Sequence, residues 1–82
     1  MDEEQILGIV EILESLLEDL PFKPKEELHK VILTLKKNSL DSETLMKIQD
    51  DLEMISSMSS IDSFSRNEII NIVTEIESIY NS

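Results

Sequence analysis

The chain has 82 residues, of which 40% are hydrophobic, so it forms one small domain whose core must take up most of its apolar side chains. Its 18 acidic and 7 basic residues give a net charge of −11. This charge argues against nucleic-acid binding, because phosphate backbones are bound through Lys and Arg. The absence of cysteine excludes disulfides, zinc–thiolate sites and a thiol nucleophile.

Two further features concern location. No apolar run approaches the ~20 residues of a membrane span. The first residues, Met1-Asp2-Glu3-Glu4, lack the basic start of a signal peptide. We therefore expect no contact with membranes and a cytoplasmic location.

Four stretches repeat apolar residues at helical spacing, and the segments between them hold both prolines and the densest run of serines. We expect helices near residues 3–19, 24–37, 42–57 and 66–80. Short links force sequential helices to pack as neighbours. This order therefore predicts an all-α fold, a compact antiparallel four-helix bundle that forms a single domain over residues 1–82.

The first expected helix has an unusually wide apolar stripe. Its seam consists of Ile6, Ile9, Leu13, Leu16 and Leu20, and the stripe is widened by Leu7, Val10, Ile12 and Leu17. Asp2 and Gln5 have the spacing of a capping box, which satisfies backbone donors at a helix start. The surplus of apolar side chains predicts burial either in the bundle or against a second copy of the chain.

The prolines separate the first two helices. Pro21 and Pro24 each lack a backbone donor and disfavour helical geometry in the preceding residue, and Pro24 suits a first helical position. The second helix points Leu28, Val31, Ile32 and Leu35 inward and leaves Leu33 off the main stripe.

Asp41 is the expected cap of the third helix, because its carboxylate can accept from exposed backbone amides. The seam of this helix consists of Leu45, Ile48, Leu52 and Ile55. Met46, Met54 and Met58 flank the seam. We interpret these methionines as core filling; the alternative is an adaptable binding groove.

The run from Ser56 to Phe64 is expected to be a loop. Ser65 and Glu68 then have capping-box spacing, and Phe64 is positioned to pack against Ile69 as a hydrophobic staple. The fourth helix points Ile69, Ile72, Val73, Ile76 and Ile79 inward.

The charges are unevenly distributed along the chain. Residues 1–22 sum to −7, residues 23–47 to +2 and residues 48–82 to −6. In one interpretation the basic second helix only relieves the repulsion among its acidic neighbours. In the other, the acidic faces of the first and third helices attract a basic protein partner.

Two short motifs in the sequence suggest possible sites. Glu26 and His29 have the Glu-x-x-His spacing of di-iron helical bundles, but such a site needs further inward carboxylates, so we expect a solvent-facing histidine and no metal. Asn38-Ser39-Leu40 partly resembles the Asp-Ser-Leu motif of acyl carrier proteins, which implies Ser39 as carrier of a phosphopantetheine arm. The alternative is that Ser39 is a loop residue between two helices.

A chain with one His and one Gly cannot assemble a catalytic triad or a phosphate-binding loop. We therefore expect no catalytic residues and no cofactor. The prediction is a small acidic interaction or structural protein that binds an unknown protein partner or self-associates.

Three segments resemble a small archaeal family of uncharacterised helical proteins. They are Leu16-Leu17-Glu18-Asp19, Leu52-Glu53-Met54-Ile55-Ser56 and Ile70-Asn71-Ile72-Val73-Thr74-Glu75-Ile76-Glu77. The chain departs from the family at Phe22-Lys23-Pro24-Lys25 and over residues 56–63. The resemblance implies a compact four-helix fold and supplies no catalytic residues.

Overall fold

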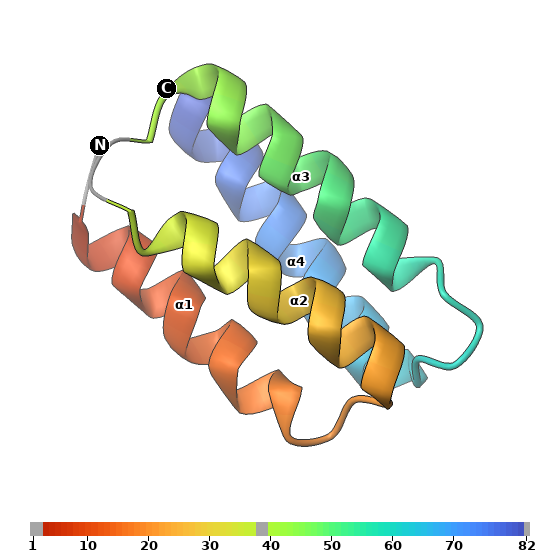
Figure 1. Cartoon of the computed structure of the whole chain (residues 1–82). Helices are drawn as coiled ribbons and strands as arrows, with labels where there is room; N and C mark the ends of the chain where they lie inside the picture. Colours follow the sequence, from red (N-terminus) through yellow and green to blue (C-terminus); the bar gives the residue numbers. More distant parts are fainter. Residues whose placement is uncertain (1–2, 38–39, 82) are drawn as a thin grey trace.

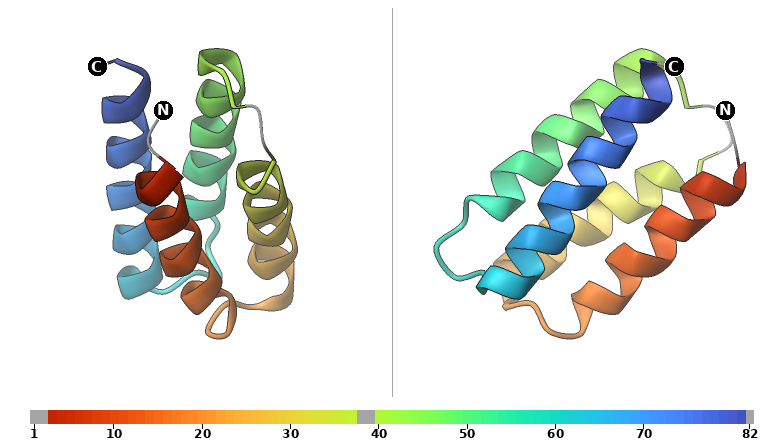
Figure 2. Two further views of the ribbon diagram at one scale, coloured as in Figure 1. Left: turned by 90° about the vertical axis from the view of Figure 1, so that its left-hand side faces the viewer. Right: turned by 180° about the vertical axis from the view of Figure 1, so that it is seen from behind.

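A computed structural model describes residues 3–37 and 40–81. They form four helices, α1 (Glu3–Leu17), α2 (Phe22–Leu35), α3 (Ser42–Ser56) and α4 (Ser63–Tyr80), and no strand. Consecutive helices run antiparallel and pack as neighbours (Figure 1). They lie in two layers, α2 with α3 and α1 with α4 (Figure 2). The predicted all-α, compact antiparallel four-helix bundle is confirmed.

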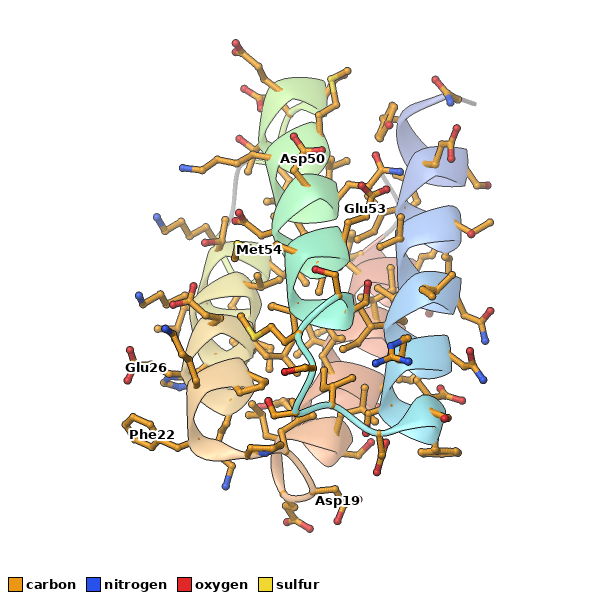
Figure 3. All side chains as sticks on the ribbon, turned by 90° about the vertical axis from the view of Figure 1, so that its right-hand side faces the viewer. Asp19, Phe22, Glu26, Asp50, Glu53 and Met54 are labelled. Carbon is orange, nitrogen blue, oxygen red and sulfur yellow. The ribbon has the colours of Figure 1, made fainter. Side chains whose placement is uncertain are left out.

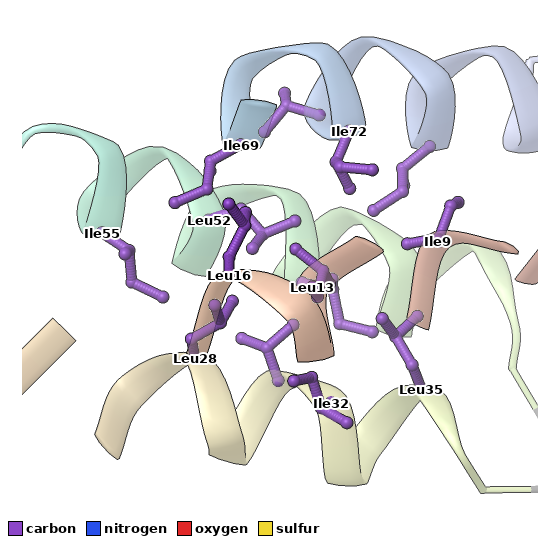
Figure 4. Close-up of a cluster of buried hydrophobic side chains, with 14 of the residues drawn as sticks. Ile9, Leu13, Leu16, Leu28, Ile32, Leu35, Leu52, Ile55, Ile69 and Ile72 are labelled. Atoms are coloured by element: carbon purple, nitrogen blue, oxygen red, sulfur yellow. The ribbon is translucent and has the colours of Figure 1, made fainter. Parts of the chain in front are cut away.

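The core is one continuous cluster of branched aliphatic side chains from all four helices (Figure 4). The predicted seams of α1, α2 and α3 are buried throughout, and in α4 only Ile79 is partly exposed. Leu20 and Ile61, from the links between helices, are also buried in this cluster. A fully buried Leu or Ile side chain contributes about 1.5–3 kcal/mol, so this cluster is the main source of stability.

The wide apolar stripe of α1 is not fully buried. Leu7 is 60% exposed and Ile12 is also exposed, whereas Val10 is buried and Leu17 is half-buried. Helix α1 ends at Leu17, two residues before the predicted end. Part of its stripe lies outside the core, so burial of the surplus within the bundle is only partial and the alternative of a second copy stays a prediction. A bundle helix buries the seam that faces its neighbours, and Leu7 lies beyond that seam.

Helix α2 begins two residues before the predicted start, at Phe22, with Pro21 as its extended N-cap residue. Its first helical hydrogen bond runs from Lys25 N–H to the Pro21 carbonyl, at 3.0 Å. Pro24 is the third helical residue, where a missing N–H removes no hydrogen bond, and its ring is buried. The expectation that Pro24 opens the helix was wrong because the whole first turn tolerates proline.

Helix α3 begins as predicted, since Asp41 Oδ1 accepts a hydrogen bond from Thr44 N–H at 2.8 Å. The interpretation of its methionines as core filling needs correction. Met46 and Met54 are exposed, and Met58 is partly buried against the core.

Helix α4 begins earlier than predicted, at Ser63. Its N-cap is Asp62, whose Oδ1 accepts from Ser65 N–H at 2.7 Å. Ser65 is thus a buried residue of the first turn. The prediction of a capping box that starts at Ser65 was therefore wrong. Phe64 is exposed and does not form the expected staple.

The link between α3 and α4 is shorter than expected. It is fixed by a side chain buried in the core and by hydrogen bonds from Arg66. Ile61 inserts into the core. Arg66 Nε donates to the Ser56 carbonyl at 2.9 Å, and Arg66 Nη2 donates to the Ile61 carbonyl at 3.4 Å. One side chain therefore satisfies backbone acceptors at both ends of the link.

Some predictions fall on residues outside the described ranges. Asp2 of the expected first capping box is one of these, and so are Asn38 and Ser39 of the carrier-like motif. Over residues 3–37 and 40–81, no helix combines the length and apolar content that a bilayer span requires.

Candidate interaction surfaces

Two outer faces of the bundle carry exposed apolar side chains next to charge. The first, the α1/α2 face, is marked by an ion pair and a shallow depression. Lys36 Nζ lies 3.1 Å from Glu14 Oε2 across the two helices. The depression, near the turn between the helices, is lined by Leu17, Phe22, Lys25, Glu26 and His29.

Exposed apolar residues of the α1/α2 face follow helical spacing. Phe22 is 79% exposed and Leu33 is 52% exposed, and they are the first and last members of the series 22, 26, 29 and 33 on α2. Figure 3 shows Phe22 and Glu26 pointing away from the bundle. On α1, exposed Leu7 begins a similar outward-facing row, which continues through residues 11, 14 and 18. This face therefore presents three large apolar side chains to solvent.

The two helices of the α1/α2 face carry opposite charge. The α1 series contains Glu11, Glu14 and Glu18, and α1 contains no basic residue. On the side of α2 toward α1, Lys25 lines the depression beside Leu17, and Lys36 pairs with Glu14. Lys30 lies about 140° from Lys25 around the helix and pairs with Glu27. Lys25 and Lys36 therefore form the basic edge of this face, with Glu26 exposed beside them. An acidic ridge and a basic ridge thus run side by side on one surface.

The second surface, the α3/α4 face, lies on the opposite side of the bundle (Figure 1). It is centred on Gln49, whose Nε2 donates to the Val73 carbonyl at 3.5 Å and whose Oε1 accepts from the Tyr80 hydroxyl. These bonds tie α3 to α4 directly beneath the surface. The α3/α4 face is therefore supported by polar contacts that the α1/α2 face does not share.

Around Gln49 the α3/α4 face is acidic and partly apolar. Met46 is 51% exposed and Ile70 is 46% exposed, and each lies one turn from the Gln49–Val73 contact along its helix. Asp50, Glu53 and Glu77 are exposed in the same region, with Glu53 on the side of α3 toward α4 (Figure 3).

The bases of α3 and α4 do not neutralise this face. Lys47 precedes Gln49 by two residues, which places it about 160° away around α3. Arg66 keeps its positive charge while it donates to the carbonyls of the α3–α4 link, so one base stands against three carboxylates. The three carboxylates therefore determine the sign of the surface.

Of the predicted site residues, Glu26 and His29 lie one turn apart on α2 and line the same depression. Glu26 and His29 are both exposed, which confirms the solvent-facing histidine. Among residues 3–37 and 40–81, no group of three or more His, Cys, Asp or Glu side chains could hold a metal ion. Ser39 lies outside the described residues, so its role as a carrier serine stays a prediction that the mass of the protein after phosphopantetheinyl-transferase treatment would test.

Two carboxyl groups of the described residues, Asp41 and Asp62, have lowered pKa values. The backbone N–H of Thr44 lowers the pKa of Asp41, and the backbone N–H of Ser65 lowers the pKa of Asp62. Both aspartates are helix caps, so these shifts reflect structural hydrogen bonds.

Comparison of the chain with family models, with curated proteins and with solved structures finds no match. The resemblance to the archaeal family of helical proteins thus stays a prediction from the residues that carry it.

The sequence indicated parts of both surfaces: the wide stripe of the first helix, the acidic faces of the first and third helices, and a possible methionine groove that includes Met46. The 4–3–4 spacing of Phe22, Glu26, His29 and Leu33 was a signal for a second apolar stripe on α2. Met46 and Ile70 gave no such signal, because they lie on different helices and become neighbours of one face only through the packing of α3 against α4.

Proposed function

We propose that this protein is a non-catalytic, cytoplasmic interaction protein that binds a basic partner through its α3/α4 face. The observation that carries the proposal is the grouping of Asp50, Glu53 and Glu77 around exposed Met46 and Ile70. A basic amphipathic helix matches this chemistry, because its Lys or Arg side chains would meet carboxylates while its apolar side chains cover the methionine and isoleucine.

The support beneath the face favours a preformed binding surface. Gln49 bridges both helices, and Arg66 holds the adjacent link, so α3 and α4 have little freedom to move apart. A preformed surface costs less entropy on binding than one that must be ordered.

The test compares capture of proteins from native lysate by the wild type and by Glu53→Lys/Glu77→Lys. The matched control is Glu68→Lys/Glu75→Lys, which changes the net charge equally on the far side of α4. We expect a basic protein to be retained at low salt by the wild type and the control only, and to elute as salt rises. Equal retention by all three proteins, or none by the wild type, would contradict the proposal.

A further inference from the structure

We infer that the α1/α2 face binds a second copy of the chain and forms a symmetric dimer whose two-fold axis runs parallel to the helices. The argument begins with Leu7, Phe22 and Leu33. These side chains lie on one face, at exposures of 60%, 79% and 52%, and core packing within the chain does not cover them. Large apolar groups collected on one face are a feature of protein interfaces.

The opposite charges of α1 and α2 favour a second copy of the chain as the partner that binds the α1/α2 face. A basic partner would match the glutamates of α1 but meet the lysines of α2, and an acidic partner would have the opposite conflict. A second copy carries both ridges. Rotation by 180° about an axis parallel to the helices places α1 of each copy against α2 of the other. Acidic residues then face basic residues in both of these helix contacts.

The other two-fold arrangement of these faces is disfavoured. Rotation about an axis perpendicular to the helices within the interface would stack α1 on α1. It would then oppose Glu11 and Glu18 of one copy to the same residues of the other. Like charges across an interface suppress such pairing, so the charges determine the orientation as well as the occupant.

The surface area of the α1/α2 face is sufficient for a dimer interface. A standard interface uses about 800 Å² from each partner. This is roughly 15% of the 5205 Å² that the protein exposes, and the outer sides of two adjacent helices in a four-helix bundle can supply it. The α3/α4 face stays open on the outside of each copy, so the dimer does not depend on the proposed function.

The experiment uses two charge-reversed variants of the whole chain. In Glu11→Lys/Glu18→Lys both ridges become basic, and in Lys25→Glu/Lys36→Glu both become acidic. We expect the wild type to dimerise at micromolar to ~1 mM concentration in sedimentation equilibrium. Each variant alone is expected to be a folded monomer under the same conditions, by circular dichroism and by mass.

The decisive sample is the equimolar mixture. Each copy then presents the charge that the other lacks, and the mixture is expected to recover dimers that weaken as salt rises. A mixture that remains monomeric, variants that still dimerise alone, or a wild type that is monomeric at ~1 mM would overturn the inference.

A second pair of variants covers the outcome in which a charge reversal prevents folding. Leu33→Glu is expected to weaken dimerisation at least tenfold, because it places a charge at one of the large apolar contacts of the interface. Met46→Glu is the matched control, since Met46 is equally exposed on the α3/α4 face. It is expected to leave the dimer unchanged, and equal effects of the two substitutions would refute the placement of the interface.

Discussion

The α1/α2 face and the α3/α4 face are built from similar amphipathic helices, yet they differ in what lies beneath them. Gln49 and Arg66 cross-link α3, α4 and their link through hydrogen bonds to backbone carbonyls. Between α1 and α2 the polar contact is the exposed Glu14–Lys36 ion pair. Equal burial of the core seams therefore leaves two helix pairs that are joined by different kinds of polar contact, from which we expect a difference in rigidity between the two faces.

The largest expected effect tests whether the two helix pairs are one cooperative unit. Leu13 on α1 and Leu52 on α3 are fully buried in the same core. We expect Leu13→Ala and Leu52→Ala each to cost about 2–5 kcal/mol and to lower Tm by roughly 8–40 °C. Circular dichroism reports all helices, and fluorescence of Tyr80, the one tyrosine, reports α4.

Both signals are expected to change together in both variants, because the core is continuous. If Leu13→Ala left the Tyr80 transition unchanged, α3 and α4 would fold without α1, and the single-core description would be wrong.

The next effect compares the polar contacts of the two pairs. Arg66→Met removes the donors to the Ser56 and Ile61 carbonyls and is expected to cost about 1–3 kcal/mol in urea unfolding. Lys36→Met, which removes the same charge from an exposed ion pair, is expected to cost less than about 1 kcal/mol. Equal costs would remove the difference in rigidity between the two faces.

The start of α4 provides a sharper test of local structure. With Asp62 as the cap, Asp62→Ala is expected to lower Tm by several degrees, because Ser65 N–H loses its acceptor. Ser65→Ala is expected to leave Tm unchanged or raise it slightly, since the buried Ser65 hydroxyl has no hydrogen-bond partner among the described residues. The reverse order would restore Ser65 as the cap.

The same caps predict a dependence on pH. The folded-state pKa values of Asp41 and Asp62 lie below those of unfolded aspartates. Their contribution is therefore fully present above about pH 4 and is lost as pH falls through the lower folded values. In acid titrations followed by thermal melts, Asp41→Asn/Asp62→Asn is expected to lose less stability below pH 4 than the wild type. Parallel losses would assign the acid sensitivity to other carboxylates.

The smallest effect concerns the Glu14–Lys36 pair itself. A double-mutant cycle with Glu14→Gln and Lys36→Met is expected to give a coupling energy of about 0.2–1 kcal/mol, which declines with added salt. A coupling above about 2 kcal/mol, insensitive to salt, would show that α1 and α2 are joined as firmly as α3 and α4.

The seams of the bundle could be predicted because helical periodicity alone places a side chain in the core. The start of α4 could not, because Asp62 and Ser65 offer overlapping caps three residues apart. The structure selects Asp62, which follows the core residue Ile61. Similarly, proline is compatible with several positions of a first turn, so Pro24 did not define where α2 begins.

The two surfaces could be predicted only in part. The sequence shows that Leu33 is off the main stripe, but which helix lies beside it depends on tertiary packing. The same holds for Met46, whose surroundings combine residues far apart in the chain. Charge segregation along the chain was visible, whereas its division between two opposite faces required the arrangement of the helices.

The most direct test of the difference between the faces is a dilution series followed by NMR. Amide chemical shifts of the isotope-labelled wild type would be recorded from micromolar concentrations to ~1 mM. We predict concentration-dependent shifts clustered around Leu7 and Leu33, with constant shifts around Met46 and Ile70. Shifts centred on Met46 and Ile70, or spectra independent of concentration, would contradict the account.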